Sequence, residues 1–204
     1  MQFFQLQKEK LIAPDIYQTS FEGVLFLKRT QHSDQRGWYC ELARIKELNQ
    51  VLPQPFIVQQ INLSNSQTKV ARGFHAENWS KLITPLGGEC LSVLADFRVN
   101  SPTYKQILAF KLGESDQENP EALNGSIFVP PGIGNSFLVT KGPLYYLYCV
   151  DALYKERDAS GDLAISLFDP ELEVEWPINK NEMIISERDL NSITLQQKIT
   201  QNQN

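Results

Sequence analysis

The stretch SFLVTKGPLYYLYCV, residues 136–150, decides the fold class. It holds two short runs rich in β-branched and aromatic residues, Ser136–Val139 and Leu144–Val150, with Gly142-Pro143 between them. Runs of this kind separated by a turn are typical of β-strands. In the second run, alternation places Tyr146 and Tyr148 on one face, and the opposite face is also apolar. We therefore expect this strand to be covered on both sides.

The same pattern continues outward from about Gly23 to Ser166, and the breaks between runs are rich in Gly, Pro and Asn. Besides the two runs above, strands are expected at Gly23–Leu27, Trp38–Ala43, Val58–Ser64, Val70–His75, Lys81–Thr84, Cys90–Phe97, Gln106–Leu112, Ser126–Val129 and Ala164–Phe168. About ten strands at this spacing predict an all-β sandwich or barrel.

Two segments have a helical pattern. Arg44–Asn49 is a short exposed turn or helix, and Ser186–Asp189 has the Ser-x-x-acid form of a helix N-terminus. Leu190, Ile193 and Leu195 follow the second segment at near-helical spacing.

No repeat or linker divides the chain, so residues 1–204 are expected to form a single domain. Residues 1–22 are an N-terminal extension that we expect to pair with a neighbouring subunit's sheet edge, because an exposed edge must be covered. Residues 197–204 end in polar side chains with nothing to bury, which predicts a frayed tail.

Composition excludes several classes of function. The chain has only two histidines, so a metal site built on three imidazoles is impossible. Its three cysteines are far apart and lack a Cys-x-x-Cys pair, which indicates reduced thiols in a cytoplasmic protein. The longest apolar run is much shorter than the ~20 residues of a membrane span. A net charge of −5 argues against nucleic-acid binding.

His75 is the residue best suited to proton transfer near neutral pH, since His32 lies in a polar loop. A structural histidine at a strand end is an equally good interpretation. Arg72 and His75 are three positions apart, so a regular strand would point them to opposite faces. Gly73 between them can host a bulge, which would bring both side chains to one pocket.

Other polar residues have simple structural interpretations when each is taken alone. Tyr148 is a core aromatic by default, and Asp189 completes a capping box after Ser186. Lys81 and Arg36 are by default surface residues.

Together, however, these residues fall in short blocks whose order and spacing are distinctive. The blocks are Asp34–Glu41, Gln60–Ser64, Ala71–His75, Lys81–Ile83, Gly88-Glu89, Asp96–Arg98, Ser101–Tyr104, Phe128–Gly132, Leu147-Tyr148, Phe168–Pro170, Glu175–Pro177 and Ser186–Asp189. Over roughly Val24 to Leu195, this arrangement resembles the dTDP-4-dehydrorhamnose 3,5-epimerase family.

The resemblance implies a cupin-type jelly roll with short C-terminal helices. It also implies a homodimer with exchanged N-terminal strands, and catalysis without metal or cofactor. Members of the family epimerise 4-keto-6-deoxy sugars linked to a nucleoside diphosphate, on the way to deoxysugars of bacterial surface polysaccharides or natural products.

The resemblance also assigns roles to individual positions. His75 matches the catalytic base, Asp189 the carboxylate that orients it, Tyr148 the general acid and Lys81 the cation beside the keto oxygen. The positions that match substrate-binding residues are Arg36, Glu41, Gln60, Asn62, Arg72, Asn135 and Tyr154.

The sequence departs from the family at a few places. Typical members have His where this chain has Asn135, the segment Ala76–Ser80 with Trp79 lacks the usual Gln-rich character, and the loop at 113–124 is longer and more acidic. These departures leave open whether C3 alone or both C3 and C5 are inverted, and whether the nucleotide is dTDP, CDP or GDP. The alternatives are a 3,4-keto-isomerase on the same fold and a non-catalytic sugar-binding cupin.

Overall fold

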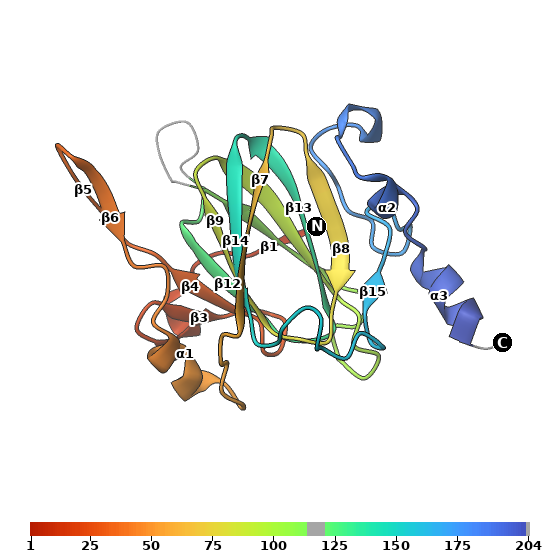
Figure 1. The fold of residues 1–204 in the computed structure, drawn as a ribbon, viewed down its shortest axis with the longest axis horizontal. Coiled ribbons are helices and arrows are strands. Elements are labelled where there is room, and N and C mark those ends of the chain that lie inside the picture. Colours follow the sequence, from red (N-terminus) through yellow and green to blue (C-terminus); the bar gives the residue numbers. More distant parts are fainter. Residues whose placement is uncertain (114–120, 203–204) are drawn as a thin grey trace.

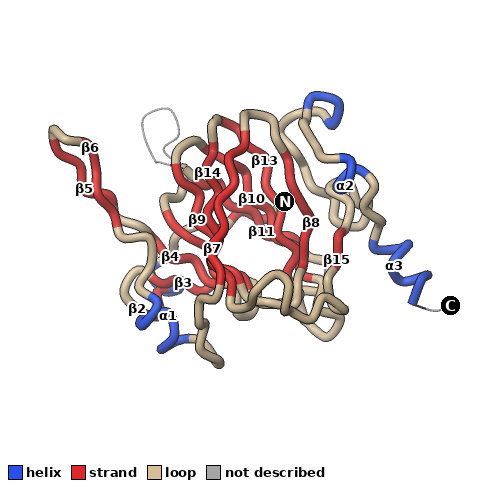
Figure 2. The backbone as a smooth tube through the Cα atoms, in the orientation of Figure 1, coloured by secondary structure: helices blue, strands red, loops and turns tan. Residues whose placement is uncertain are grey.

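The computed structural model describes residues 1–113 and 121–202, and two β-sheets dominate its regular structure (Figures 1 and 2). The first sheet has the order β1 (Gln2–Phe3), β11 (Ile107–Leu112), β10 (Glu89–Asp96), β13 (Ile133–Lys141), β8 (Ala71–Ala76) and β15 (Leu163–Ala164). The second has the order β2 (Leu11–Ala13), β3 (Ile16–Gln18), β4 (Leu25–Lys28), β12 (Gly125–Val129), β9 (Lys81–Leu86), β14 (Leu144–Val150) and β7 (Gln60–Ser66).

The expected all-β jelly roll is confirmed by this arrangement. The two sheets enclose a core of alternating apolar side chains, in which the rings of Phe4, Phe26 and Phe110 meet at centroid distances of 5.1–6.3 Å. A hairpin of β5 (Gln31–Asp34) and β6 (Gly37–Cys40) projects away from the sheets (Figure 1).

Helices are short and cover parts of the sheets. α1 (Ile45–Val51) lies where the sequence predicted and buries Leu48 against the outer face of the second sheet. α2 (Glu187–Leu190) and α3 (Leu195–Asn202) flank the first sheet, and single 3₁₀ turns occupy Lys8–Lys10 and Lys180–Glu182. No helix within 1–113 and 121–202 is long and apolar enough to cross a membrane.

The helical spacing from Ser186 to Leu195 does not produce one continuous helix. Backbone pairing between Ile193 and Ile165 interrupts it, because the chain after α2 adds a bridge beside the first sheet. α3 then extends to Asn202, across most of the tail predicted to fray from residue 197. Residues 203–204, and positions 114–120 of the acidic loop, lie outside the described part of the chain.

The N-terminal extension pairs here with the chain's own sheets. β1 lies parallel to β11, and β3 pairs with β4. Exchange of this extension between subunits stays a prediction.

The expectation that β14 is covered on both faces is wrong for the single chain. Its inner face is buried at Tyr146, but Tyr145 on the outer face is 43% exposed. On the neighbouring edge strand β7, Ile61 and Leu63 are 63% and 60% exposed on the same outer face. An apolar strip along β7 and β14 is therefore open to solvent.

Candidate active site

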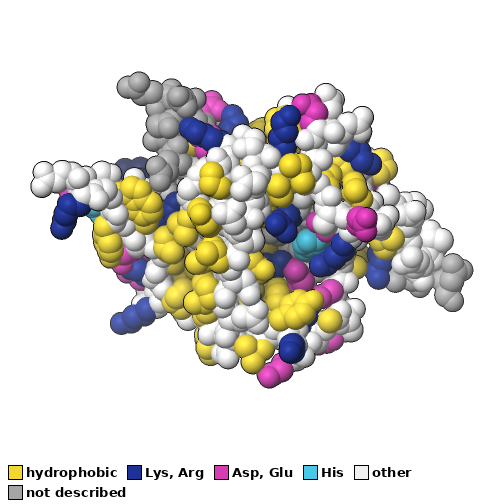
Figure 3. All heavy atoms as spheres, turned by 45° about the horizontal axis from the view of Figure 1, so that its top comes forward, with side chains coloured by type: hydrophobic (Ala, Val, Ile, Leu, Met, Phe, Trp, Pro, Cys, Tyr) yellow, Lys and Arg dark blue, Asp and Glu magenta, His cyan; other side chains and the backbone are white. Residues whose placement is uncertain are grey.

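A cleft of about 420 Å³ opens between the two sheets, where β8 and β13 face β7, β9 and β14. Figure 3 shows this hollow, with a histidine, basic side chains and acidic side chains gathered in it. Its lining consists of Gln60, Asn62, Ser64, Arg72, His75, Glu77, Trp79, Lys81, Ile83, Asn135, Phe137, Tyr146, Tyr148, Tyr154 and Arg188. Nine of the eleven predicted site residues lie in or directly beneath this cleft.

His75 is held by a buried carboxylate. Its Nε2 lies 2.7 Å from Oδ1 of Asp189, whose second oxygen accepts a hydrogen bond from the Gly73 amide at 3.4 Å. Burial raises the pKa of the Asp189 carboxyl, but its interactions with His75, the Gly73 amide and Arg188 together outweigh burial and hold that pKa below its ordinary value. An ionised Asp189 fixes the imidazole orientation and stabilises its protonated form.

Asp189 owes its place to the cap of α2. Ser186 at the N-cap accepts a hydrogen bond from the Asp189 amide at 3.2 Å, as the Ser-x-x-acid pattern predicted. The reciprocal half of a capping box is not formed, because the carboxylate turns to His75 instead. The capping-box interpretation of Asp189 is therefore wrong, and the functional interpretation is favoured.

The bulge predicted at Gly73 is confirmed. In the pairing of β8 with β13, His75 lies opposite Asn135 and Arg72 opposite Phe137, so β8 contains one extra residue between these pairs. Gly73 has a φ of +116°, and a Cβ there would lie 2.5 Å from the Asn135 carbonyl oxygen. Only glycine allows this close approach, which brings Arg72 and His75 to the same cleft.

Lys81 is no surface lysine, since it is only 5% exposed at the start of β9. Its Nζ donates to the carboxylate of Glu77 and, at 3.3 Å, to the His75 carbonyl oxygen. Burial lowers the pKa of Lys81, and the negative charge of Glu77 opposes that change. A buried amino group is thus held against the His75 backbone in the lining of the cleft.

Tyr148 comes from β14 and shares the inward face with Tyr146. Burial, and then the charge of Glu77, raise the pKa of the Tyr148 phenol, so it stays protonated at neutral pH. Tyr146 packs on Phe137 with ring centroids 4.2 Å apart and donates to Oδ1 of Asn135 at 3.1 Å. Asn135 therefore has a fixed amide where typical family members carry a histidine.

The mouth of the cleft is polar on one side and aromatic on the other. On β7, Nε2 of Gln60 donates to Oδ1 of Asn62 at 2.7 Å, and Oε1 of Gln60 accepts from the Tyr154 amide at 3.0 Å. The Arg157 guanidinium packs on the rings of Trp79 and Tyr154, at 4.7 and 4.5 Å from their centroids.

Within residues 1–113 and 121–202, no three His, Cys, Asp or Glu side chains are grouped so as to hold a metal ion.

The family model for dTDP-4-dehydrorhamnose 3,5-epimerase matches residues 18–197. The chain belongs to this family. A Streptomyces griseus dTDP-4-dehydrorhamnose 3,5-epimerase is 29% identical over 174 residues, which is 83% of this chain and 81% of that protein. A Streptomyces niveus dTDP-4-dehydrorhamnose 3-epimerase is 26% identical over 178 residues, 85% of this chain and 80% of that protein.

Solved structures of the family share the fold. The Streptococcus suis protein RmlC in complex with dTDP-D-xylose superposes with a TM-score of 0.75 at 28% identity, covering 89% of this chain and 91% of that one. The family therefore includes both 3,5-epimerases and a 3-epimerase among the relatives of this chain.

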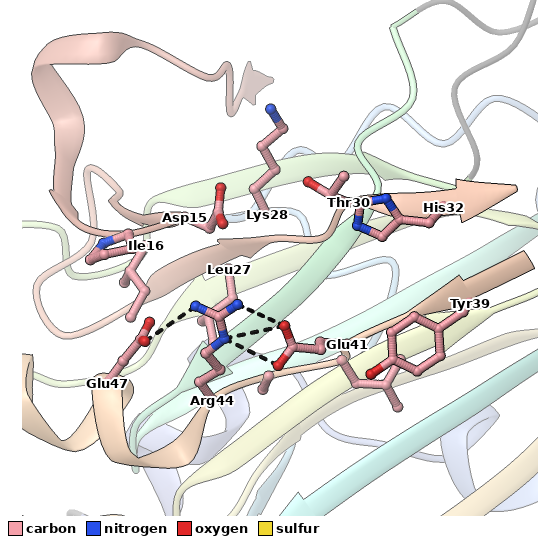
Figure 4. Close-up of a pocket in the computed structure, with 13 residues that line it drawn as sticks. Asp15, Ile16, Leu27, Lys28, Thr30, His32, Tyr39, Glu41, Arg44 and Glu47 are labelled. Atoms are coloured by element: carbon pink, nitrogen blue, oxygen red, sulfur yellow. Dashed lines mark hydrogen bonds and ion pairs between the residues drawn. The ribbon is translucent and has the colours of Figure 1, made fainter.

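Two predicted binding residues do not reach the cleft of their own chain. Arg36 lies at the end of the β5–β6 hairpin, paired with Asp34, and its side chain is 83% exposed. Glu41 lines a separate hollow of about 290 Å³ at the base of the hairpin. There it accepts hydrogen bonds from Arg44, as Figure 4 shows.

Two charged residues that line the cleft were not predicted from the sequence. Arg188 lines the cleft from α2 and adds a second arginine to the cleft, besides Arg72. Glu77 lines it directly after β8. The signal for Arg188 was its place next to Asp189. The signal for Glu77 was an acidic residue two positions after His75, in a segment already noted as atypical.

Proposed function

We propose that this protein inverts C3 of a nucleoside-diphosphate 4-keto-6-deoxy sugar, through an enolate and without a cofactor, in deoxysugar biosynthesis. The observation that supports this most directly is the meeting of His75, Asp189, Lys81 and Tyr148 at one cleft. A base with its orienting carboxylate, an ammonium group and a protonated phenol are the groups that epimerisation next to a ketone requires.

In this proposal His75 removes the C3 proton, and Asp189 stabilises the imidazolium that forms. The developing negative charge collects on the O4 oxygen, where the Lys81 ammonium stabilises it. Tyr148 then delivers a proton to the opposite face of the ring. Inversion at C5 would need a second cycle by the same groups.

The nucleoside diphosphate is bound by the polar mouth of the cleft. Arg72 and Arg188 supply positive charge for the diphosphate, although the protein as a whole is negative. Gln60, Asn62 and Tyr154 lie at the same mouth. The cytoplasmic location expected from the cysteine pattern stays a prediction.

We infer further that the protein is a homodimer in which the β5–β6 hairpin of one subunit reaches the cleft of its partner. The family resemblance assigns Arg36 and Glu41 to substrate binding, yet neither lines the cleft of its own chain. The open apolar strip of Ile61, Leu63 and Tyr145 along an edge strand supports an interface between copies.

The decisive experiment incubates the protein with 4-keto-6-deoxyglucose linked to dTDP, CDP or GDP in deuterated water. NMR then measures deuterium incorporation at C3 and at C5 of the sugar. The His75→Asn variant is the control for spontaneous exchange. We expect incorporation at C3 with at least one nucleotide. Binding without incorporation on any of the three would contradict the proposal and favour a sugar-binding protein.

A further inference from the structure

Glu77 occupies a position that the reaction above does not explain. It follows β8 directly, two residues after His75, and its side chain is 20% exposed in the cleft wall. Its carboxylate forms an ion pair with Lys81, which is almost completely buried. A carboxylate beside the ammonium weakens the positive field on a substrate oxygen, so its presence at this point needs a reason.

The reason lies in the burial of Lys81. An ammonium group in such a site loses most of its hydration, and a lone one loses its proton instead. Lys81 has three N–H donors, and among the described residues only Glu77 and the His75 carbonyl accept from them. One N–H therefore stays available for the substrate, and the two acceptors fix where it points.

We propose that Glu77 is a positioning residue, whose carboxylate holds the Lys81 ammonium charged and oriented toward the oxygen that becomes the enolate. This rests on the proposed function, because the oxygen belongs to the 4-keto sugar. Glu77 acts through Lys81, and it needs no contact with the substrate.

The charges around Lys81 support this role. Besides Glu77, two charged residues from the segment after β14 act on the pKa of Lys81: Asp162 raises it and Arg157 lowers it. These two residues form an ion pair with each other. On the neighbouring strand β12, the residue opposite is the apolar Val129. Glu77 thus supplies the nearest negative charge that keeps Lys81 protonated.

Glu77 also acts on Tyr148. Its negative charge raises the pKa of the phenol, whereas Arg72 lowers it and Tyr154 raises it slightly further. Loss of the Glu77 charge lowers the pKa of both Lys81 and Tyr148. Both groups act in their protonated forms in the proposed reaction. Lower pKa values of Lys81 and Tyr148 therefore lower the pH above which activity is lost.

The test compares Glu77→Gln, which keeps an acceptor but removes the charge, with Glu77→Asp, which keeps the charge. Glu171→Gln is the matched control, because it removes the Lys105–Glu171 ion pair on another part of the surface. The first readout is the rate of C3 deuterium exchange against pH. The second is the titration of the Lys81 ammonium by ¹⁵N NMR, assigned with Lys81→Arg, which requires no activity.

For Glu77→Gln we expect the alkaline limb of the exchange rate and the Lys81 titration to move about 1–3 pH units lower. Glu77→Asp should recover most of that change, and Glu171→Gln should match the wild type. An unchanged Lys81 titration in Glu77→Gln would overturn the proposal while leaving the epimerase function intact. A wild type without exchange on any nucleotide sugar would overturn the function, and the Lys81 titration would still decide what Glu77 does.

Discussion

At the scale of single residues, the two groups proposed to transfer protons have different surroundings in the cleft. His75 is hydrogen-bonded to an ionised, buried Asp189 and can accept a proton. Tyr148 lies on a facing strand, where burial and Glu77 keep its phenol protonated. A proton acceptor and a proton donor on different strands are what proton removal from one face and return to the other require.

Tyr148→Phe should retain C3 deuterium exchange while slowing inversion by about 10²–10⁴-fold, because only the donor on the second face is lost. NMR in deuterated water measures exchange and the stereochemistry of the product in one sample. His75→Asn is the comparison and should lose both. Equal loss of exchange and inversion in Tyr148→Phe would mean that the phenol is not the acid.

At the scale of elements, the bulge in β8 is the feature on which the site depends. It lets Arg72 and His75, three positions apart, share one cleft, and it places the Gly73 amide against Asp189. It requires glycine at position 73, because β13 passes so close that no side chain fits there.

Gly73→Ala should therefore lower stability by at least about 1–3 kcal/mol from backbone strain alone, and should lower activity as β8 moves from β13. The added Cβ would lie 2.5 Å from the Asn135 carbonyl oxygen. Gly161→Ala is the control, since its Cβ would meet nothing nearer than 3.6 Å. Urea unfolding and exchange rates measure the two effects. Equal behaviour of the two variants would contradict the role given to the bulge.

At the scale of the whole molecule, the single chain places the proposed reacting groups together but leaves two predicted binding residues outside the cleft. The β5–β6 hairpin, whose turn holds Arg36, projects away from the two sheets (Figure 1), and Arg36 does not line the cleft of its own chain. The outer strip along β7 and β14 is apolar and open. A second copy on that strip would cover apolar surface, and its hairpin would supply the missing residues.

Complementation between variants checks this arrangement. Arg36→Ala and His75→Asn chains are co-expressed with different tags, and the mixed dimer is purified. If Arg36 serves the partner's cleft, the mixed dimer has one intact site and about half of the wild-type exchange rate, whereas each parent is about tenfold or more below it. If Arg36 serves its own cleft, the mixed dimer gains nothing over the parents, and the shared-site proposal fails. The wild-type/His75→Asn dimer is the positive control.

Most strands of the fold could be predicted from the local pattern of apolar and polar residues. Alternating apolar runs such as Leu144–Val150 predicted strands, and nearly every predicted strand exists with its ends moved by a few residues. Ala164–Phe168 shortened to β15 at Leu163–Ala164, because the chain there turns to bridge with Ile193. Strands can be predicted from the sequence because the alternation of apolar and polar residues reflects which face of the sheet is buried.

The sequence by itself indicated the succession of strands along the chain, the N-cap at Ser186 and a glycine able to host the bulge. The family blocks pointed to His75, Lys81, Tyr148 and Asp189 as the proposed reacting residues. Tertiary structure alone decided the surroundings of those residues. In the folded chain, Lys81 is buried and forms an ion pair with Glu77. Arg188 lines the cleft, whereas Arg36 and Glu41 lie outside it. The physical reason is that burial and charge pairing arise between segments distant in sequence, whereas strand and cap patterns are local.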